Sequence, residues 1–249
     1  MISLKNSDEL NKMRKACAIS QEVLLYAGEQ IAPGMSTWEL DRLIERFIRS
    51  HGAVPNFKGL GGFPGSACIS LNNVVIHGIP SKHIIIKEGD IVSIDVGAMV
   101  DGFHGDNAAT FTVGEVLPEA KRLCQVTKDS LMIGIEAAVK GNRIGDIGHA
   151  VQSYVEAQGF SVVRDFVGHG VGRQLHEDPE VPNYGKAGHG PRLVPGMTIA
   201  IEPMVNQFGW EVEVLDDGWT TVTKDGGLAA HFEHTIAITD NGPVILTKV

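Results

Sequence analysis

The sequence has few cysteines, no long apolar run and an excess of acidic over basic residues. Its three cysteines, Cys17, Cys68 and Cys124, are far apart and form no CxxC pair, which favours free thiols in a reducing cytosol over a disulfide framework. No apolar run approaches the roughly 18 residues of a membrane span, and residues 1–21 lack the apolar region of a signal peptide. A net charge of −9 argues against nonspecific nucleic-acid binding, which needs a basic surface. We therefore expect a cytoplasmic protein without membrane association or specific nucleic-acid binding.

The stretch from Ile91 to Thr112 predicts a β-hairpin. Apolar residues alternate with small or polar ones around Asp101-Gly102, and an Asp-Gly pair between such strands is the strongest short-range hairpin signal. A turn there makes Asp95 and Asp106 diagonal neighbours on one face, where two buried carboxylates would need a cation or a proton. A solvated hairpin with two exposed acids is the alternative. The predicted cross-strand pairs are Val100–Phe103, Gly97–Asp106 and Asp95–Ala108.

The chain divides into two similar halves, about residues 7–113 and 118–248. Each half has two helical patterns, which end near glycines, and then strands, the last of which is predicted over Ala230 to Thr239. An offset of 107 residues aligns Gly34/Gly141, Leu40/Ile147, Ile44/Val151, Phe47/Tyr154, Ile48/Val155, Gly52/Gly159, Gly89/Gly196, Val92/Ile199, Ile94/Ile201 and Asp95/Glu202. Chance similarity between helix–strand units is the alternative. The shared register favours one α+β domain over residues 1–249, with two pseudo-symmetric α/β halves whose antiparallel sheets enclose a cleft.

Five residues form a candidate metal site in this arrangement: Asp95, Asp106, His169, Glu202 and Glu233. The offset places Glu202 where the first half has Asp95, and His169 lies in a Gly-His-Gly segment with little steric cover. Four carboxylates carry a formal charge of about −4, which two divalent ions roughly 3.5 Å apart would nearly balance. Mixed carboxylate and imidazole ligands suit Mn, Fe, Co or Zn better than Ca. Each residue alone has a simpler explanation as an ion-pair, capping or structural residue.

Four segments resemble a known family over essentially the whole chain. The segments IDVGAMVDGFHGDNAATF, VGHGVGRQLHEDP, IAIEPMV and FEHTIAIT are similar to the signatures of type I methionine aminopeptidases. The resemblance implies the pita-bread fold and a metal-dependent hydrolase that removes the initiator methionine when the P1′ residue is small. It implies that the five acidic and imidazole residues bind two divalent ions (Co, Mn, Fe(II) or Zn), which Asp106 and Glu233 bridge.

The resemblance also implies roles for residues near the metals. A metal-bridged water would attack the first peptide bond, and Glu202 would handle its proton. His77 and His176 would contact the peptide nitrogen and the carbonyl oxygen around that bond. The substrate-binding positions are Phe57, Leu60, Phe63, Cys68, His77, Leu175, His176 and Trp219.

Three pocket positions depart from the commonest bacterial pattern of the family. Phe57, Leu60 and Leu175 stand where that pattern has Cys, Tyr and Phe. The substitutions keep the pocket apolar but change its shape, so we expect altered fine specificity.

The family resemblance implies nascent polypeptide N-termini as partners, with transient ribosome contact, and a monomeric protein. Two alternatives remain. An Xaa-Pro peptidase of the prolidase or aminopeptidase P type shares the metal ligands, but usually has a large additional N-terminal domain for which there is no room before Ser7. A noncatalytic pita-bread binding module typically lacks some of the ligands, whereas all five are present here.

Overall fold

The computed structural model describes residues 1–248, in which a pair of long helices precedes a set of strands twice along the chain. The helices are α1 (Ser7–Gln30), α2 (Thr37–Ser50), α3 (Pro118–Ala137) and α4 (Ile144–Ala157), with a short 3-10 helix, η1 (Leu60–Gly62). The strands are β1 (Val54–Pro55), β2 (Cys68–Leu71), β3 (Val74–Ile76), β4 (Ile91–Val100), β5 (Phe103–Thr112), β6 (Ser161–Val162), β7 (Gly168–Gly170), β8 (Glu177–Val181), β9 (Thr198–Ile201), β10 (Met204–Asn206), β11 (Val212–Val214), β12 (Thr221–Thr223), β13 (Ala229–His231), β14 (Glu233–Thr239) and β15 (Gly242–Ile245). None of the helices in this part of the chain is both long and apolar enough to cross a bilayer.

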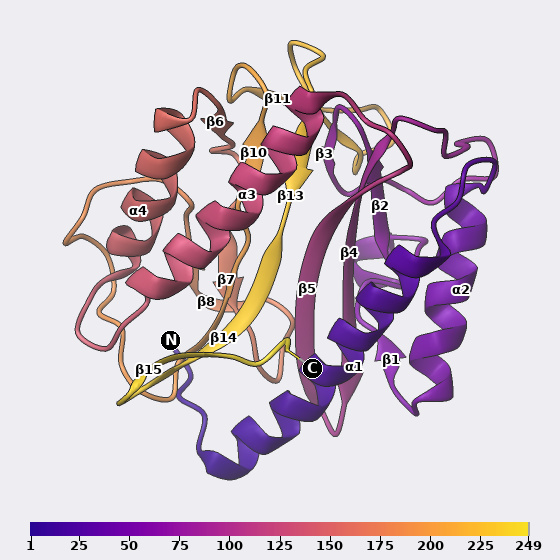
Figure 1. Ribbon diagram of the computed structural model, residues 1–249. Helices are drawn as coiled ribbons and strands as arrows, with labels where there is room; N and C mark the ends of the chain where they lie inside the picture. Colours follow the sequence, from indigo (N-terminus) through magenta and orange to yellow (C-terminus); the bar gives the residue numbers. More distant parts are fainter. Residues whose placement is uncertain (249) are drawn as a thin grey trace.

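One antiparallel sheet of nine strands runs through both halves. Its strand order is β1-β4-β5-β14-β9-β7-β8, with β2 on β4 and β15 on β14. The halves meet where β5 pairs with β14, and Figure 1 shows these two strands between the helix pair α1/α2 and the helix pair α3/α4. Two small sheets, β13-β10-β6 and β11-β12-β3, complete the fold. The antiparallel sheets expected from the sequence are confirmed.

The large sheet has two chemically different faces. Ile94 and Val96 of β4 pack in a core cluster with residues of α1 and α2, and Ile236 of β14 packs in a cluster with residues of α3 and α4. Because side chains alternate along a strand, the residues next to these isoleucines and valines in the sequence face the other way. Those residues include Asp95 and Thr235. One face of the sheet is therefore core, and the other is free to carry polar chemistry.

The hairpin formed by β4 and β5 has the predicted register. Asp95 pairs with Ala108 and Gly97 pairs with Asp106 across the two strands. The turn residues Asp101 and Gly102 have φ angles of 53° and 75°, the left-handed values that a two-residue type I′ turn requires. The Asp-Gly pair therefore sets which residues of the two strands share a face.

The strand predicted over residues 230–239 is wrong in one respect. It is interrupted at Phe232, whose amide donates a hydrogen bond to Pro203 O (3.4 Å). The residues before this break form β13 in a small sheet, and those after it form β14 in the large sheet. The interruption lets His231 and Glu233 approach one region from two different sheets.

Backbone contacts recur at the offset of 107 residues. The Gly34 amide donates to Ile86 O (2.8 Å), and the Gly141 amide donates to Leu193 O (3.0 Å). The φ angles of these two glycines are 91° and 94°, values that favour glycine. The equivalent contacts support the internal repeat.

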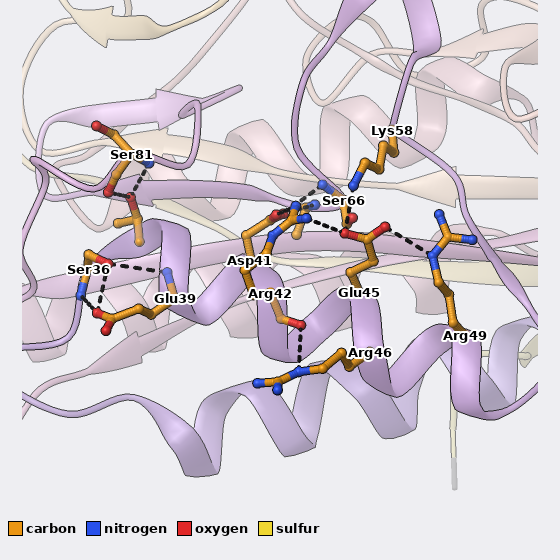
Figure 2. A network of polar contacts seen from close by, with 12 residues as sticks. Ser36, Glu39, Asp41, Arg42, Glu45, Arg46, Arg49, Lys58, Ser66 and Ser81 are labelled. Carbon is orange, nitrogen blue, oxygen red and sulfur yellow. Dashed lines mark hydrogen bonds and ion pairs between the residues drawn. The ribbon is translucent and has the colours of Figure 1, made fainter.

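Helix α2 fixes the start of strand β2 through a buried carboxylate (Figure 2). Ser36 and Glu39 form a capping box at the beginning of the helix. Asp41, in the next turn, is completely buried and accepts hydrogen bonds from the amides of Ser66 (2.6 Å) and Ala67 (3.1 Å). Because these amides directly precede β2, Asp41 holds the beginning of that strand in place.

Candidate metal centre

A cavity of about 900 Å³ contains all five predicted ligands. Asp95 comes from β4, Asp106 from β5, His169 from β7 and Glu233 from the first position of β14. Glu202 directly follows β9. Segments from both halves of the chain therefore contribute to one acidic site.

The side chains converge closely enough to share a cation. His169 Nε2 lies 3.4 Å from Glu202 Oε1 and 3.8 Å from Asp106 Oδ2. Asp106, His169 and Glu233 each offer one ligand atom, and these atoms lie within 4.8 Å of one another. Asp95 and Glu233 both pair with Ala108, from the two neighbouring strands. The register of the sheet thus sets the order of the acids across the site.

The imidazole of His169 has the tautomer of a metal ligand. Its Nδ1 lies 2.9 Å from Gly170 O, which can only accept, so Nδ1 carries the hydrogen atom in the neutral ring. Burial lowers the pKa of His169 to about 4, which keeps the ring neutral near pH 7. The lone pair of Nε2 is therefore available on the side of the carboxylates.

Four buried carboxylate oxygens have no hydrogen-bond partner within residues 1–248: Asp95 Oδ1, Asp106 Oδ1, Glu202 Oε1 and Glu233 Oε1. Burial raises the pKa of Asp95 to about 7. Burial, and then repulsion between neighbouring carboxylates, raises the pKa values of Asp106, Glu202 and Glu233 well above their ordinary range. Unpartnered, mutually repelling carboxylates around a neutral imidazole require protons or cations. This donor set fits divalent metal ions.

His77 is held at the cavity in an unusual backbone conformation. Its φ angle is 58°, which is uncommon for a residue with a side chain and often marks a functional position. The next residue must be small, because a Cβ atom at Gly78 would contact Ile69 O of the neighbouring backbone. The His77 ring packs edge-on against Phe166 and Trp219, with centroids 5.5 and 6.2 Å apart. Burial lowers the pKa of His77 to about 4.

His176 lies on the loop between β7 and β8, next to His169. The two ring centroids are 4.4 Å apart at an interplanar angle of 76°. Burial lowers the pKa of His176, so a neutral imidazole faces the cavity beside the carboxylates. Such a ring has one N–H available as a hydrogen-bond donor.

An apolar pocket adjoins the acidic site. Phe63 and Trp219 form its aromatic side, with ring centroids 5.2 Å apart, and Leu60 lies at the rim with 42% of its surface exposed. The predicted pocket residues other than Leu175 line the cavity itself, whereas Leu175 is buried in the apolar cluster with Phe57, Phe63 and Cys68. The structure therefore brings the predicted pocket residues together.

Sequence reasoning missed several residues of the same cavity. Ile76 and Phe166 line it, and their only signal was their place one and three residues before His77 and His169. His231 does not line the cavity, but it is buried behind Glu202, with Nε2 unpartnered in the described chain and 3.8 Å from Glu202 Oε2. The break between β13 and β14 places it there, and no sequence pattern indicated that break.

Comparisons with known proteins indicate the family of the chain. A family described as metallopeptidase family M24 matches residues 11–240. The chain is 57% identical over 249 residues to the methionine aminopeptidase of Clostridium perfringens, covering 100% of both chains. It is similar to the crystal structure of a methionine aminopeptidase from Thermotoga maritima, with a TM-score of 0.98, 48% identity and 100% coverage of both chains. Its similarity to a prolidase from Pyrococcus furiosus is lower, with a TM-score of 0.78 and 25% identity, covering 99% of this chain and 65% of that one.

Proposed function

Because this chain belongs to metallopeptidase family M24 and, within it, to the methionine aminopeptidases, we propose that its acidic cavity hydrolyses the first peptide bond of nascent polypeptides that begin with methionine. The fold is the pita-bread fold of that family. The observation that carries the assignment of the site is the group of four buried, unpartnered carboxylate oxygens around a neutral imidazole, beside an apolar pocket.

A metallopeptidase of this family uses divalent metal ions. We propose two ions, because four carboxylates and a neutral imidazole are nearly balanced by two divalent charges. Asp106 and Glu233, which are almost fully buried, would bridge the ions, while Asp95, His169 and Glu202 would complete the ligand set. Mn, Co, Fe(II) or Zn suits these donors. Such ions, when bound, polarise the scissile carbonyl and make water a stronger acid.

The chain's own residues supply the proton transfers and orientation. Glu202 has one oxygen beside His169 and the other toward His231, and burial raises its pKa. A carboxylate with a raised pKa would accept a proton from the attacking water and return it to the leaving nitrogen. His176 would donate a hydrogen bond to the carbonyl oxygen as negative charge develops there. His77 would contact the peptide nitrogen.

Substrate recognition follows from the pocket. Its aromatic, aliphatic and thiol lining matches an unbranched thioether side chain. Burial raises the pKa of Cys68 well above its ordinary value, so this wall stays uncharged. We propose a methionine pocket here, with a small residue preferred at P1′.

We further propose that the protein acts as a monomeric single domain, with halves at about 7–113 and 118–248, in the cytoplasm and in transient contact with the ribosome. The five proposed ligands line one cavity of this chain. The three cysteines are buried and free, as suits a reducing compartment. Co-sedimentation with ribosomes, at several salt concentrations, tests the contact.

A substrate panel tests the reaction. The enzyme should release methionine from Met-Ala-Ser, and should leave N-acetyl-Met-Ala-Ser and Xaa-Pro peptides intact. Preferred cleavage of Xaa-Pro peptides would instead assign a proline-directed peptidase. Metal binding without hydrolysis of any peptide would indicate a noncatalytic binding module.

A further inference from the structure

A buried ion pair joins the first residues of the chain to the loop that carries His176. Lys5 Nζ donates to Glu177 Oε2 at 2.5 Å, and the two side chains are only 3% and 12% exposed. Lysine is almost never fully buried unless it is paired. Glu177 directly follows His176, so the carboxylate that holds Lys5 is one residue from the imidazole at the cavity.

The same carboxylate organises the loop between β7 and β8. Glu177 Oε1 accepts a hydrogen bond from the Gln174 amide (3.1 Å), while Oε2 binds Lys5. The loop backbone lies against the pair, because a Cβ atom at Gly172 would be 2.6 Å from both Lys5 Nζ and Glu177 Oε1. The ion pair therefore fills the space under the loop and connects its two ends.

Lys5 is itself fixed to the body of the protein. Its amide donates to Gly196 O at 2.7 Å, and the Gly196 amide donates to Ile238 O at 3.0 Å. On the other side of the loop, the His104 amide donates to Gly172 O at 2.9 Å. Two other ion pairs join the same parts of the chain, Arg173 with Glu9 and the Met1 amino group with Asp178, and the Arg173 and Asp178 side chains are 65% and 60% exposed. Exposed pairs contribute little. Of the three attachments, only the pair between Lys5 and Glu177 is buried on both sides.

We propose that Lys5 is a positioning residue for catalysis, which holds His176 in place through Glu177. This inference rests on the proposed function, in which His176 binds the carbonyl oxygen. Without the ammonium group, the Glu177 carboxylate would lose its partner in a buried place and would turn toward water. The neighbouring His176 would move with it. A displacement of about 1 Å can cost about 10²-fold in rate.

The test combines Lys5→Met with His176→Ala in the metal-loaded enzyme. Methionine has a similar volume without the charge. Lys5→Met should lower kcat for Met-Ala-Ser by about tenfold to a hundredfold, with KM and metal content unchanged. Lys15→Met is the matched control, because Lys15 pairs with Asp101 on the surface (side chains 66% and 47% exposed), and it should leave kcat unchanged.

The effect should depend on His176. In a His176→Ala background, Lys5→Met should lower kcat by less than about twofold, because residues that act through one another are not additive. Hydrogen exchange of the metal-free protein should show faster exchange over residues 172–178 in Lys5→Met, without a change in the β4–β5 hairpin. If Lys5→Met does not fold, Glu177→Gln is measured in the same two backgrounds, with the same expectations.

The outcomes separate this inference from the proposed function. An unchanged kcat in Lys5→Met, or an equal fall in both backgrounds, would overturn the positioning role while His176→Ala still establishes the catalytic one. An unchanged kcat in His176→Ala itself would overturn the catalytic role of that histidine, and the positioning role with it.

Discussion

Gly97 lies directly opposite Asp106 in the β4–β5 hairpin, and a Cβ atom at position 97 would lie 2.8 Å from Asp106 Oδ1 and even closer to Asn56 Nδ2. Asn56 in turn donates to Gly105 O (2.9 Å), beside the same acid. On the other side, Thr235 Oγ1 donates to Asp106 O at 2.7 Å. The orientation of the Asp106 carboxylate thus depends on the absence of a side chain at position 97 of the neighbouring strand.

Gly97→Ala should therefore weaken metal binding. The added methyl group displaces the Asp106 carboxylate or the Asn56 amide, and such disturbances of ligand orientation typically cost about 10- to 100-fold in metal affinity. Overpacking should cost a further 1–3 kcal/mol, roughly, in the free energy of unfolding. Calorimetric titration of the metal-free variant with Mn²⁺ measures the affinity, and an affinity equal to that of the parent would contradict this account.

Asp95→Asn should stabilise the metal-free protein increasingly as the pH rises. The pKa of Asp95 is raised by burial to about 7, so the folded state binds a proton more tightly than the unfolded state does. This contribution to stability is fully present below the unfolded pKa, near 4, and is lost as the pH rises through about 7. Asparagine does not titrate, so the Asp95→Asn variant keeps this contribution to stability over the whole pH range.

The measurement is the difference in unfolding free energy between Asp95→Asn and the parent from pH 4 to pH 8. Taking the difference cancels the contribution of the buried histidines to the pH dependence. Their lowered pKa values make the free energy of unfolding increase with pH, which is opposite to the effect of Asp95. The difference should increase with pH in the metal-free proteins, and should reverse in favour of the parent once metal is added. A difference that is constant with pH would show that Asp95 is not a buried carboxylate of raised pKa.

His176→Ala should lower kcat by about 10²–10³-fold, because it removes one donor to the developing oxyanion. KM should change much less, since this hydrogen bond strengthens mainly in the transition state, and metal content should stay the same. His189, an exposed histidine outside the cavity, offers a matched control as His189→Ala. A near-normal kcat with a lowered melting temperature would give His176 a structural role.

Phe63→Ala should weaken recognition of the methionine side chain. Phe63 is 3% exposed and packs against Trp219, so its loss removes one wall of the pocket. We expect kcat/KM for Met-Ala-Ser to fall by about tenfold or more, while norleucine should replace methionine in the parent at a cost of only about 1–3 kcal/mol. The control is Phe208→Ala, at an aromatic residue that is 59% exposed. It should leave kcat/KM for Met-Ala-Ser and for the norleucine peptide unchanged. If the parent enzyme turned over Lys-Ala-Ser as fast as Met-Ala-Ser, the pocket would not be selective for an apolar side chain.

The hairpin and its acids could be predicted because local chemistry determines them. The Asp101-Gly102 turn fixes the register, and the register puts Asp95 and Asp106 on one face. The offset of 107 residues then indicated Glu202. These inferences need only alternation along a strand and the conformations of a two-residue turn.

Other features depend on tertiary contacts and could not be predicted. The break at Phe232 separates two strands that the sequence predicts as one, because its amide bonds to Pro203 O in another segment. Helix α3 ends at Ala137, and the glycine that follows, Gly141, donates its amide to Leu193 O in a distant loop. Phe166 also lines the cavity through a tertiary contact, because its ring packs edge-on against His77 of a distant segment.

The most direct test of the central claim is a metal titration of the metal-free enzyme, with metal content and release of methionine from Met-Ala-Ser measured on the same samples. We expect no turnover without metal, and activity that rises with added Mn²⁺ or Co²⁺ until two ions are bound per chain. Asp106→Ala and Glu233→Ala should keep the fold, lose the bridged pair and show no turnover. Full activity in a sample verified to contain no metal would contradict the account.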